Sequence, residues 1–108
     1  MSGTILIGEK NSIPLSTVAF DRLVEKIRAE FMGDESKYMD DIYSPLDDGG
    51  MTFISLKTQN GEGFRAFCRA VDRAYKKEAS EESFHKYNDI WQTLMESLKS
   101  DSRHTEAV

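Results

Sequence analysis

Apolar residues along the chain recur at spacings that predict strands in some segments and helices in others. A short β-branched run at Thr4–Ile7 predicts a strand. Between Phe20 and Phe31 the apolar positions follow steps of three and four residues, which indicates an amphipathic helix. Ser16 or Thr17 stands where a side chain can cap the first turn of this helix. The first third of the chain is therefore predicted to form a strand and then a helix.

The middle of the chain carries the strongest turn signal. Ser44–Gly50 contains Asp-Gly and Gly-Gly steps, which favour tight turns because glycine adopts left-handed backbone angles at no steric cost. Before this segment, Tyr38–Tyr43 is predicted to be a strand. After it, Met51–Thr58 is the most continuous run of apolar and β-branched residues in the sequence. We therefore expect a hairpin, with Met51–Thr58 as the central strand of a sheet.

Two further apolar stripes with helical spacing occupy the last part of the chain, before a polar tail over residues 100–108 that we expect to be flexible. The first stripe comprises Phe64, Phe67, Cys68, Val71, Ala74 and Tyr75, and the second comprises Phe84, Tyr87, Trp91, Leu94, Met95 and Leu98. Each stripe predicts an amphipathic helix. The expected order of elements is strand, helix, strand, strand, helix, helix.

This order predicts an α+β fold, in which a small, mainly antiparallel sheet of about three strands packs with about three helices. Residues 1–108 are expected to form one globular domain, because the sequence has no repeat and no linker long enough to divide it. A hydrophobic content of 39% is enough to drive folding. The single cysteine, Cys68, cannot form an internal disulfide, and no apolar run is long enough for a signal peptide or a membrane span. These features favour a cytoplasmic protein.

Negative charge is concentrated in one segment. Residues 34–50 carry six acidic side chains and one lysine, a formal charge of -5, which equals the charge of the whole chain. The remaining residues carry 13 acidic and 13 basic side chains and are neutral by count. A local field of one sign attracts a positive partner, although a solvated acidic loop that aids solubility is an equally economical interpretation.

Large apolar and aromatic residues alternate with these carboxylates. Tyrosine is enriched at the energetic centres of protein interfaces, and carboxylates select partners rich in Lys and Arg. The pattern therefore predicts a surface that binds a basic protein. Its predicted residues are Tyr38, Asp40, Asp41, Tyr43, Asp47 and Asp48.

A basic stripe with four-residue spacing lies on the predicted second helix. Arginine can pair in bidentate fashion with either a carboxylate or a phosphate, so a phosphate or small-ligand site is one interpretation. Internal pairing with the acidic segment is another. Direct binding of nucleic acid is disfavoured, because a chain with a pI near 5.0 repels a polyanion. The stripe consists of Arg65, Arg69, Arg73 and Lys77.

The sequence contains no pattern that indicates an enzyme, a cofactor or a metal site. Asp47-Asp48-Gly49 resembles a calcium loop only superficially, because the carboxylates do not have the spacing of an EF-hand. An irregular Mg²⁺ or Ca²⁺ site remains an alternative for the acidic residues if the hairpin gathers them. Cys68 falls on the apolar side of its helix, which indicates a packing residue rather than a nucleophile.

A small, acidic, non-enzymatic inhibitor that neutralises a basic protein is the function that these features favour. In size, acidity and lack of a catalytic signature the chain resembles bacterial immunity proteins, and this resemblance implies a cognate toxin, often a nuclease, as the partner. It lies in type rather than in a motif, so it assigns no residue. The alternatives are an adaptor, chaperone or assembly subunit that binds through helical apolar surface around Tyr87 and Trp91, and a phosphate-binding domain. The oligomeric state is left open.

Overall fold

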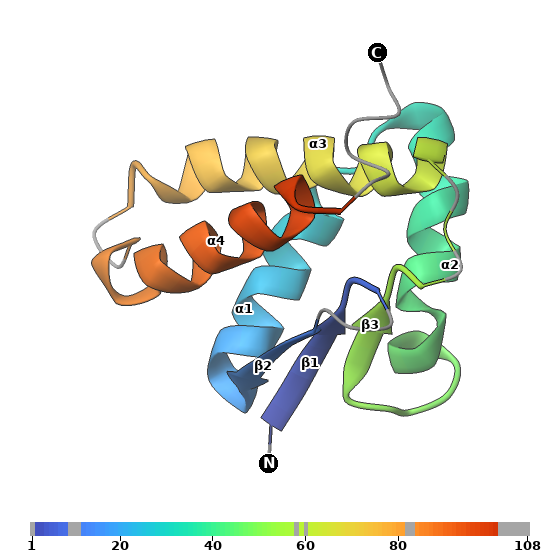
Figure 1. The fold of residues 1–108 in the computed structure, drawn as a ribbon, viewed down its shortest axis with the longest axis horizontal. Coiled ribbons are helices and arrows are strands. Elements are labelled where there is room, and N and C mark those ends of the chain that lie inside the picture. Colours follow the sequence, from blue (N-terminus) through green and yellow to red (C-terminus); the bar gives the residue numbers. More distant parts are fainter. Residues whose placement is uncertain (1, 9–11, 58, 60, 82–83, 102–108) are drawn as a thin grey trace.

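Three short strands and four α-helices make up the part of the chain that the computed structural model describes, which is residues 2–8, 12–57, 59, 61–81 and 84–101 (Figure 1). The helices outnumber the predicted three, and the α+β class is confirmed. In chain order the elements are β1 (Ser2–Leu6), β2 (Ser12–Ser16), α1 (Thr17–Arg28), the 3₁₀ turn η1 (Gly33–Glu35), α2 (Ser36–Asp47), β3 (Phe53–Ser55), α3 (Gly61–Glu78) and α4 (Phe84–Lys99).

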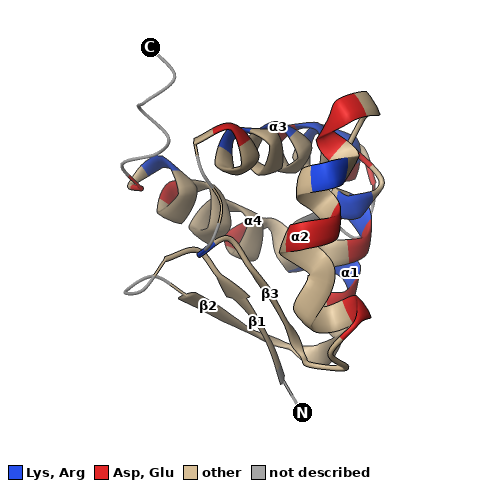
Figure 2. Ribbon diagram, turned by 90° about the vertical axis from the view of Figure 1, so that its right-hand side faces the viewer, with Lys and Arg blue, Asp and Glu red and all other residues tan. Residues whose placement is uncertain are grey.

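The sheet has the strand order β2-β1-β3, so the N-terminal strand is the central one. Strand β1 pairs antiparallel with β2 and parallel with β3, and the sheet is mixed rather than mainly antiparallel. The prediction that Met51–Thr58 forms the central strand is therefore wrong. Among the described residues of this range only Phe53–Ser55 form a strand, which lies beside helix α2 at one edge of the sheet (Figure 2), and Thr58 lies outside the described residues.

Strand β2 was not predicted, because Pro14 lies in its middle. The Thr4 N–H donates to the Thr52 carbonyl, so Thr4 turns its backbone groups toward β3. Pro14 pairs with Thr4 and thus occupies a position that makes no hydrogen bond to β1. Its nitrogen faces the outer edge of the sheet, where a proline removes no ladder bond and discourages pairing with another chain.

The segment predicted as a strand at Tyr38–Tyr43 is part of helix α2, and the predicted hairpin is absent there. Within α2 the apolar residues Met39, Ile42 and Leu46 recur at steps of three and four, which places them on one side of a helix. Pro45 lies in the last turn, close to the Asp47 end of the helix. The turn signal at Gly49-Gly50 is correct in part, because Gly50 adopts a positive φ of 64° between α2 and β3.

One face of the sheet and the inner sides of the helices enclose the core. Alternate strand residues such as Ile5, Ile13 and Ile54 are buried, and α1 packs against this face behind the strands in Figure 1. The Ala19 N–H donates to the Ser16 hydroxyl at 3.2 Å, which confirms the predicted cap of α1. The two C-terminal helices are confirmed as α3 and α4. The predicted flexible tail lies outside the described residues from position 102 onward.

Candidate functional site

Helix α2 carries its carboxylates in two rows. Asp40 and Asp47 are seven residues apart, as are Asp41 and Asp48. Seven residues make about two helical turns, so each pair shares one side of the helix. Figure 2 shows where acidic residues, drawn in red, occur along α2. We call Asp40 and Asp47 the first acidic row, and Asp41 and Asp48 the second acidic row.

The first acidic row borders helix α1. A guanidinium nitrogen of Arg28 donates to the Asp47 carboxylate at 2.7 Å, and the same guanidinium lies 4.4 Å from the ring centroid of Tyr43. Partial burial acts to lower the pKa of Arg28, but the Asp47 carboxylate and the nearby Glu25 raise it above its ordinary value. Asp40 is exposed and has no ion-pair partner among the residues described. This row therefore offers one free carboxylate and one that is already paired.

The second acidic row faces the loop between β3 and α3. Asp41 accepts a hydrogen bond from the buried side chain of Gln59 in that loop. Asp48 is exposed, and in the described ranges its carboxylate meets no cation. The two rows thus point in different directions, one toward α1 and one away from it. No three His, Cys, Asp or Glu side chains in the described structure are placed to hold a metal ion.

The two tyrosines of the predicted surface have different positions. Tyr43 is fully buried and its hydroxyl donates to the Val24 carbonyl at 2.7 Å, so it supports the core and cannot contact a partner. Burial raises the pKa of Tyr43. Tyr38 is half-buried, and its hydroxyl donates to Glu62 at 2.8 Å, a bond that raises the pKa of this phenol. Only Tyr38 remains available to a partner.

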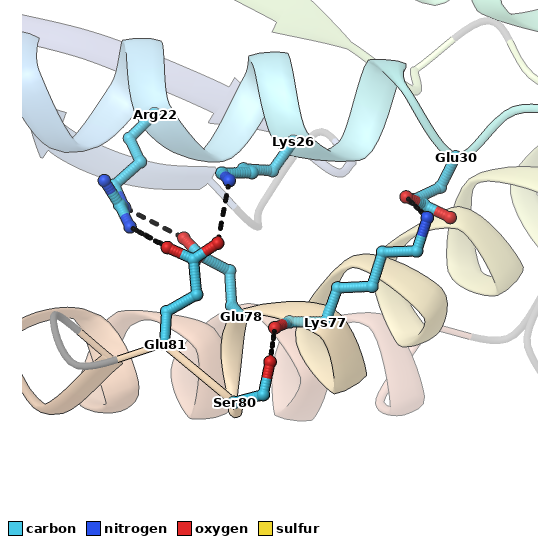
Figure 3. Close-up of polar contacts among 7 residues, drawn as sticks. All are labelled: Arg22, Lys26, Glu30, Lys77, Glu78, Ser80 and Glu81. Carbon is cyan, nitrogen blue, oxygen red and sulfur yellow. Dashed lines mark hydrogen bonds and ion pairs between the residues drawn. The ribbon is translucent and has the colours of Figure 1, made fainter.

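Most of the predicted basic stripe is paired with the segment between α1 and α2. Arg69 and Arg73 both bind the Glu35 carboxylate, at 2.8 and 2.9 Å. Lys77 binds Glu30 at 2.8 Å, as Figure 3 shows. Arg65 alone in the stripe forms no ion pair within the described structure. The stripe therefore neutralises acidic groups of its own chain, and a phosphate site would have little free positive charge to use.

The Glu35 carboxylate is the centre of this network. Partial burial acts to raise its pKa, but the N–H of Met32 and the guanidinium groups of Arg69 and Arg73 outweigh burial and hold the pKa below its ordinary value. Glu35 thus connects α3, which carries Arg69 and Arg73, to the 3₁₀ turn η1 and to the start of α2. The acidic segment predicted from sequence thus has an internal half, around Glu35, and an outward half on α2.

Glu25 extends the acidic surface onto α1, and the sequence prediction did not include it. Glu25 is exposed, and it acts electrostatically on Arg28 and Tyr43. Its place on the polar side of the predicted helix was the available signal. Charge counted along one segment does not reveal it, because a surface collects residues from several elements.

The remaining candidate chemistry has structural explanations. Cys68 is half-buried rather than buried, and it lines a groove of about 470 Å³ between α3 and α4 together with Met95 and Leu98. Trp91 is fully buried, and Arg22 stacks 4.9 Å from the ring centroid of Tyr87. Neither aromatic residue offers the open apolar surface that the adaptor hypothesis requires. None of the described helices combines the length and apolar character needed to cross a bilayer.

Comparison with known proteins identifies the family. No protein-family model matches the sequence. The chain is, however, 38% identical over 103 residues to the immunity protein CdiI of Burkholderia pseudomallei, and the alignment covers 95% of this chain and 94% of that protein. This chain belongs to the CdiI immunity proteins. The prediction of an immunity protein is thereby confirmed.

The CdiI relationship extends to the three-dimensional structure. The fold matches the structure titled as a CdiA-CT toxin from Burkholderia pseudomallei E479 in complex with its cognate CdiI immunity protein, with a TM-score of 0.91. The match covers 94% of this chain and 97% of the matched chain, at 38% sequence identity. This CdiI family member therefore shares its fold with that structure over nearly the whole length of both chains.

Proposed function

We propose that this chain binds a toxin of the CdiA-CT kind and neutralises it as a stoichiometric inhibitor, without catalysis. The observation that carries this proposal is the likeness to a CdiI protein whose structure was solved as a complex with its toxin, at a TM-score of 0.91 over 94% of the chain. A protein of this family needs a complementary surface, and it needs no reactive group. The absence of a catalytic pattern in the sequence is consistent with such a role.

We infer that the outward side of α2 contributes to the toxin-binding surface. Asp40 and Asp48 are exposed and unpaired in the described structure, and Tyr38 adds a half-buried aromatic ring beside them. A chain with a net charge of -5 attracts a basic partner and speeds its approach. The proposed partner is therefore a toxin domain with a Lys- and Arg-rich surface. Tyr43 is removed from the predicted set because it is buried.

The experiment that tests this function is a growth-protection assay. The CdiA-CT-type toxin domain encoded by the organism that produces this chain is placed under an inducible promoter in a laboratory bacterium, with or without the chain. Restored growth together with a 1:1 complex in size-exclusion chromatography supports the proposal. The toxin of Burkholderia pseudomallei E479 serves as a specificity arm. Growth arrest that the chain does not relieve, with no complex formed, would rule out neutralisation.

A further inference from the structure

One face of the sheet points away from α1, and α4 borders it at Pro14, which lines a hollow together with Asp89, Ile90 and Thr93. The register aligns Pro14, Thr4 and Phe53 across β2, β1 and β3. Successive strand residues point to opposite faces, and the neighbouring residues Ile5 and Ile54 are buried in the core. Pro14, Thr4 and Phe53 therefore share the face that points away from α1. We call these three residues the open-face row.

The open face is uncharged along its strands and carries one apolar side chain on each strand, Leu6 on β1, Pro14 on β2 and Phe53 on β3. Phe53 and Leu6 are half-buried, yet neither belongs to the core cluster or packs against it. Met51, which leads into β3, is 51% exposed and is one of three large hydrophobic residues exposed in the described structure. The described residues of this face are Thr4, Leu6, Ser12, Pro14, Ser16, Phe53 and Ser55, and all are uncharged.

The open-face row continues into the second acidic row of α2. The N–H of Met51 donates to the Pro45 carbonyl at 2.9 Å, which folds the β3 entry against the end of α2. On α2, Tyr43 and Asp47 turn toward α1, whereas Asp41 turns to Gln59 beyond β3. The side of α2 that bears Asp41 and Asp48 thus adjoins the sheet rather than α1, as Figure 2 allows the reader to follow.

An acidic surface by itself accounts for fast association more than for a long-lived complex, because exposed charge pairs contribute little free energy. Interfaces hold together through apolar or aromatic residues that become desolvated at the centre, with charged groups at the rim. The open-face row with Met51 has the composition of such a centre. The second acidic row has the composition of its rim.

We propose that Met51, Phe53 and Pro14 form the apolar anchor of the toxin interface, with the uncharged Thr4 between Phe53 and Pro14, and with Asp41 and Asp48 as the acidic rim. The occupant is a toxin surface that presents apolar side chains flanked by Lys or Arg. A second copy of this chain fits poorly, because association would bring together two molecules of net charge -5. This inference rests on the proposed neutralisation of a toxin and names the surface that achieves it.

The test compares two anchor variants with a matched control. Phe53→Thr keeps a residue that favours strands and removes the ring, and Met51→Ser removes an exposed side chain. Val18→Ser is the control, because Val18 is 69% exposed on α1 and belongs neither to the open-face row nor to the second acidic row. With the toxin that wild type neutralises, surface plasmon resonance should show at least tenfold faster dissociation for each anchor variant at unchanged association rate. The control should dissociate as wild type does.

Oxidation footprinting of the wild-type chain provides a readout that does not depend on how a variant folds. Met51 and Met32 are 51% and 63% exposed, and they lie near opposite ends of α2. Limited hydrogen peroxide followed by mass spectrometry should oxidise both residues in the free chain. The toxin should protect Met51 strongly. The extent of Met32 oxidation, measured in the free chain and in the complex, reports whether the two samples received the same oxidant dose.

The outcomes separate this inference from the function on which it rests. If wild type protects cells but Met51 oxidises equally fast in the complex and Phe53→Thr dissociates normally, the anchor is elsewhere and the immunity function stands. If wild type binds no toxin, both proposals fall. If sedimentation shows a toxin-free dimer that Phe53→Thr abolishes, the open face belongs to a second copy and the inference is overturned.

Discussion

Arg22 holds the buried carboxylate of Glu78 in a two-point contact that joins α1 to the end of α3. Its Nε and Nη2 atoms donate to the two carboxylate oxygens at 2.8 and 3.1 Å, and the Glu78 side chain is 1% exposed (Figure 3). The hydrogen bond to Glu78 raises the pKa of Arg22. Glu81 adds a second carboxylate at 3.6 Å. A buried carboxylate is tolerated here because a guanidinium and its hydrogen bonds compensate for lost hydration.

Replacing Arg22 with methionine should therefore destabilise the protein strongly. The substitution keeps much of the apolar stem but leaves the Glu78 carboxylate buried without its bidentate partner. Removing one partner of a buried pair costs about 3 kcal/mol or more, and the partial exposure of Arg22 places the expected loss near the lower end. Urea unfolding monitored by tryptophan fluorescence measures the change in free energy of unfolding.

The matched control for Arg22→Met is Lys76→Met. Lys76 binds Asp72 at 2.9 Å on the surface of α3, and both side chains are more than half exposed. An exposed pair of this kind contributes about 0–1 kcal/mol, so the control should unfold at nearly the wild-type urea concentration. Equal losses in the two variants would show that burial of Glu78 does not set the strength of its pair.

Glu35 should make stability depend on pH in the acid range. Its folded pKa lies below the ordinary glutamate value, chiefly because the Met32 N–H, Arg69 and Arg73 outweigh the effect of burial. A group with a depressed folded pKa contributes stability that is complete above its unfolded pKa and is lost as pH falls through the folded pKa. Glu35→Gln should thus be less stable than wild type at pH 7, and the difference should shrink below about pH 4.

Urea unfolding at several pH values between neutral and acid conditions checks this expectation. The control is Asp34→Asn, because Asp34 is the exposed neighbour of Glu35 and no ion pair engages it within the described ranges. Asp34→Asn should leave the pH profile close to that of wild type. If the free energy of unfolding of Glu35→Gln differed from that of wild type by the same amount at every pH, the stabilisation would not depend on the negative charge of Glu35.

The sequence predicted those elements whose apolar pattern is long enough to be unambiguous. Helices α1, α3 and α4 each carry several turns of regular spacing, and they are present as expected. Strand β2 offers only Ile13 and Leu15 as alternating apolar residues around a proline, which is too little for a local rule. Part of helix α2, Tyr38–Tyr43, was predicted to be a strand. Six residues are too few to distinguish the two-residue period of apolar positions in a strand from the 3.6-residue period in a helix.

The sequence shows which segment carries the negative charge, but which of its carboxylates face outward depends on the tertiary structure. Asp47 pairs with Arg28 across 19 positions, and Glu35 pairs with Arg73 across 38. Nothing local in the sequence reveals such pairings. Local charge density shows where carboxylates cluster, and only the fold shows which of them pair within the chain and which face solvent.

Tyr43 should behave as a core residue, in contrast to its predicted role at an interface. Tyr43→Phe removes the hydroxyl that donates to the Val24 carbonyl at 2.7 Å and leaves that buried acceptor without this bond. The expected loss is about 1 kcal/mol of unfolding free energy. The affinity for the toxin, measured by isothermal titration calorimetry below the unfolding temperature, should stay within twofold. A large loss of affinity in a stably folded variant would return Tyr43 to the interface.

Charge reversal on α2 should slow the association with the toxin. Asp40→Lys/Asp48→Lys removes the two exposed carboxylates that no described cation neutralises, and steering by a local field acts on the association rate. A loss of at least tenfold in this rate is expected at low ionic strength. It should diminish toward 1 M salt, where the Debye length is about 3 Å. Stopped-flow fluorescence at several salt concentrations gives the rates directly.

The control for this double variant carries the same change in net charge at a different place. Asp72→Lys/Glu96→Lys reverses two exposed carboxylates on α3 and α4, away from α2. If the field is local, the control should lose much less of the association rate than the α2 variant, because screened charges act over about one Debye length. Equal slowing by both variants would mean that the overall charge of -5 steers the toxin and that α2 has no special role. A faster α2 variant would place a basic surface of this chain, not an acidic one, at the interface.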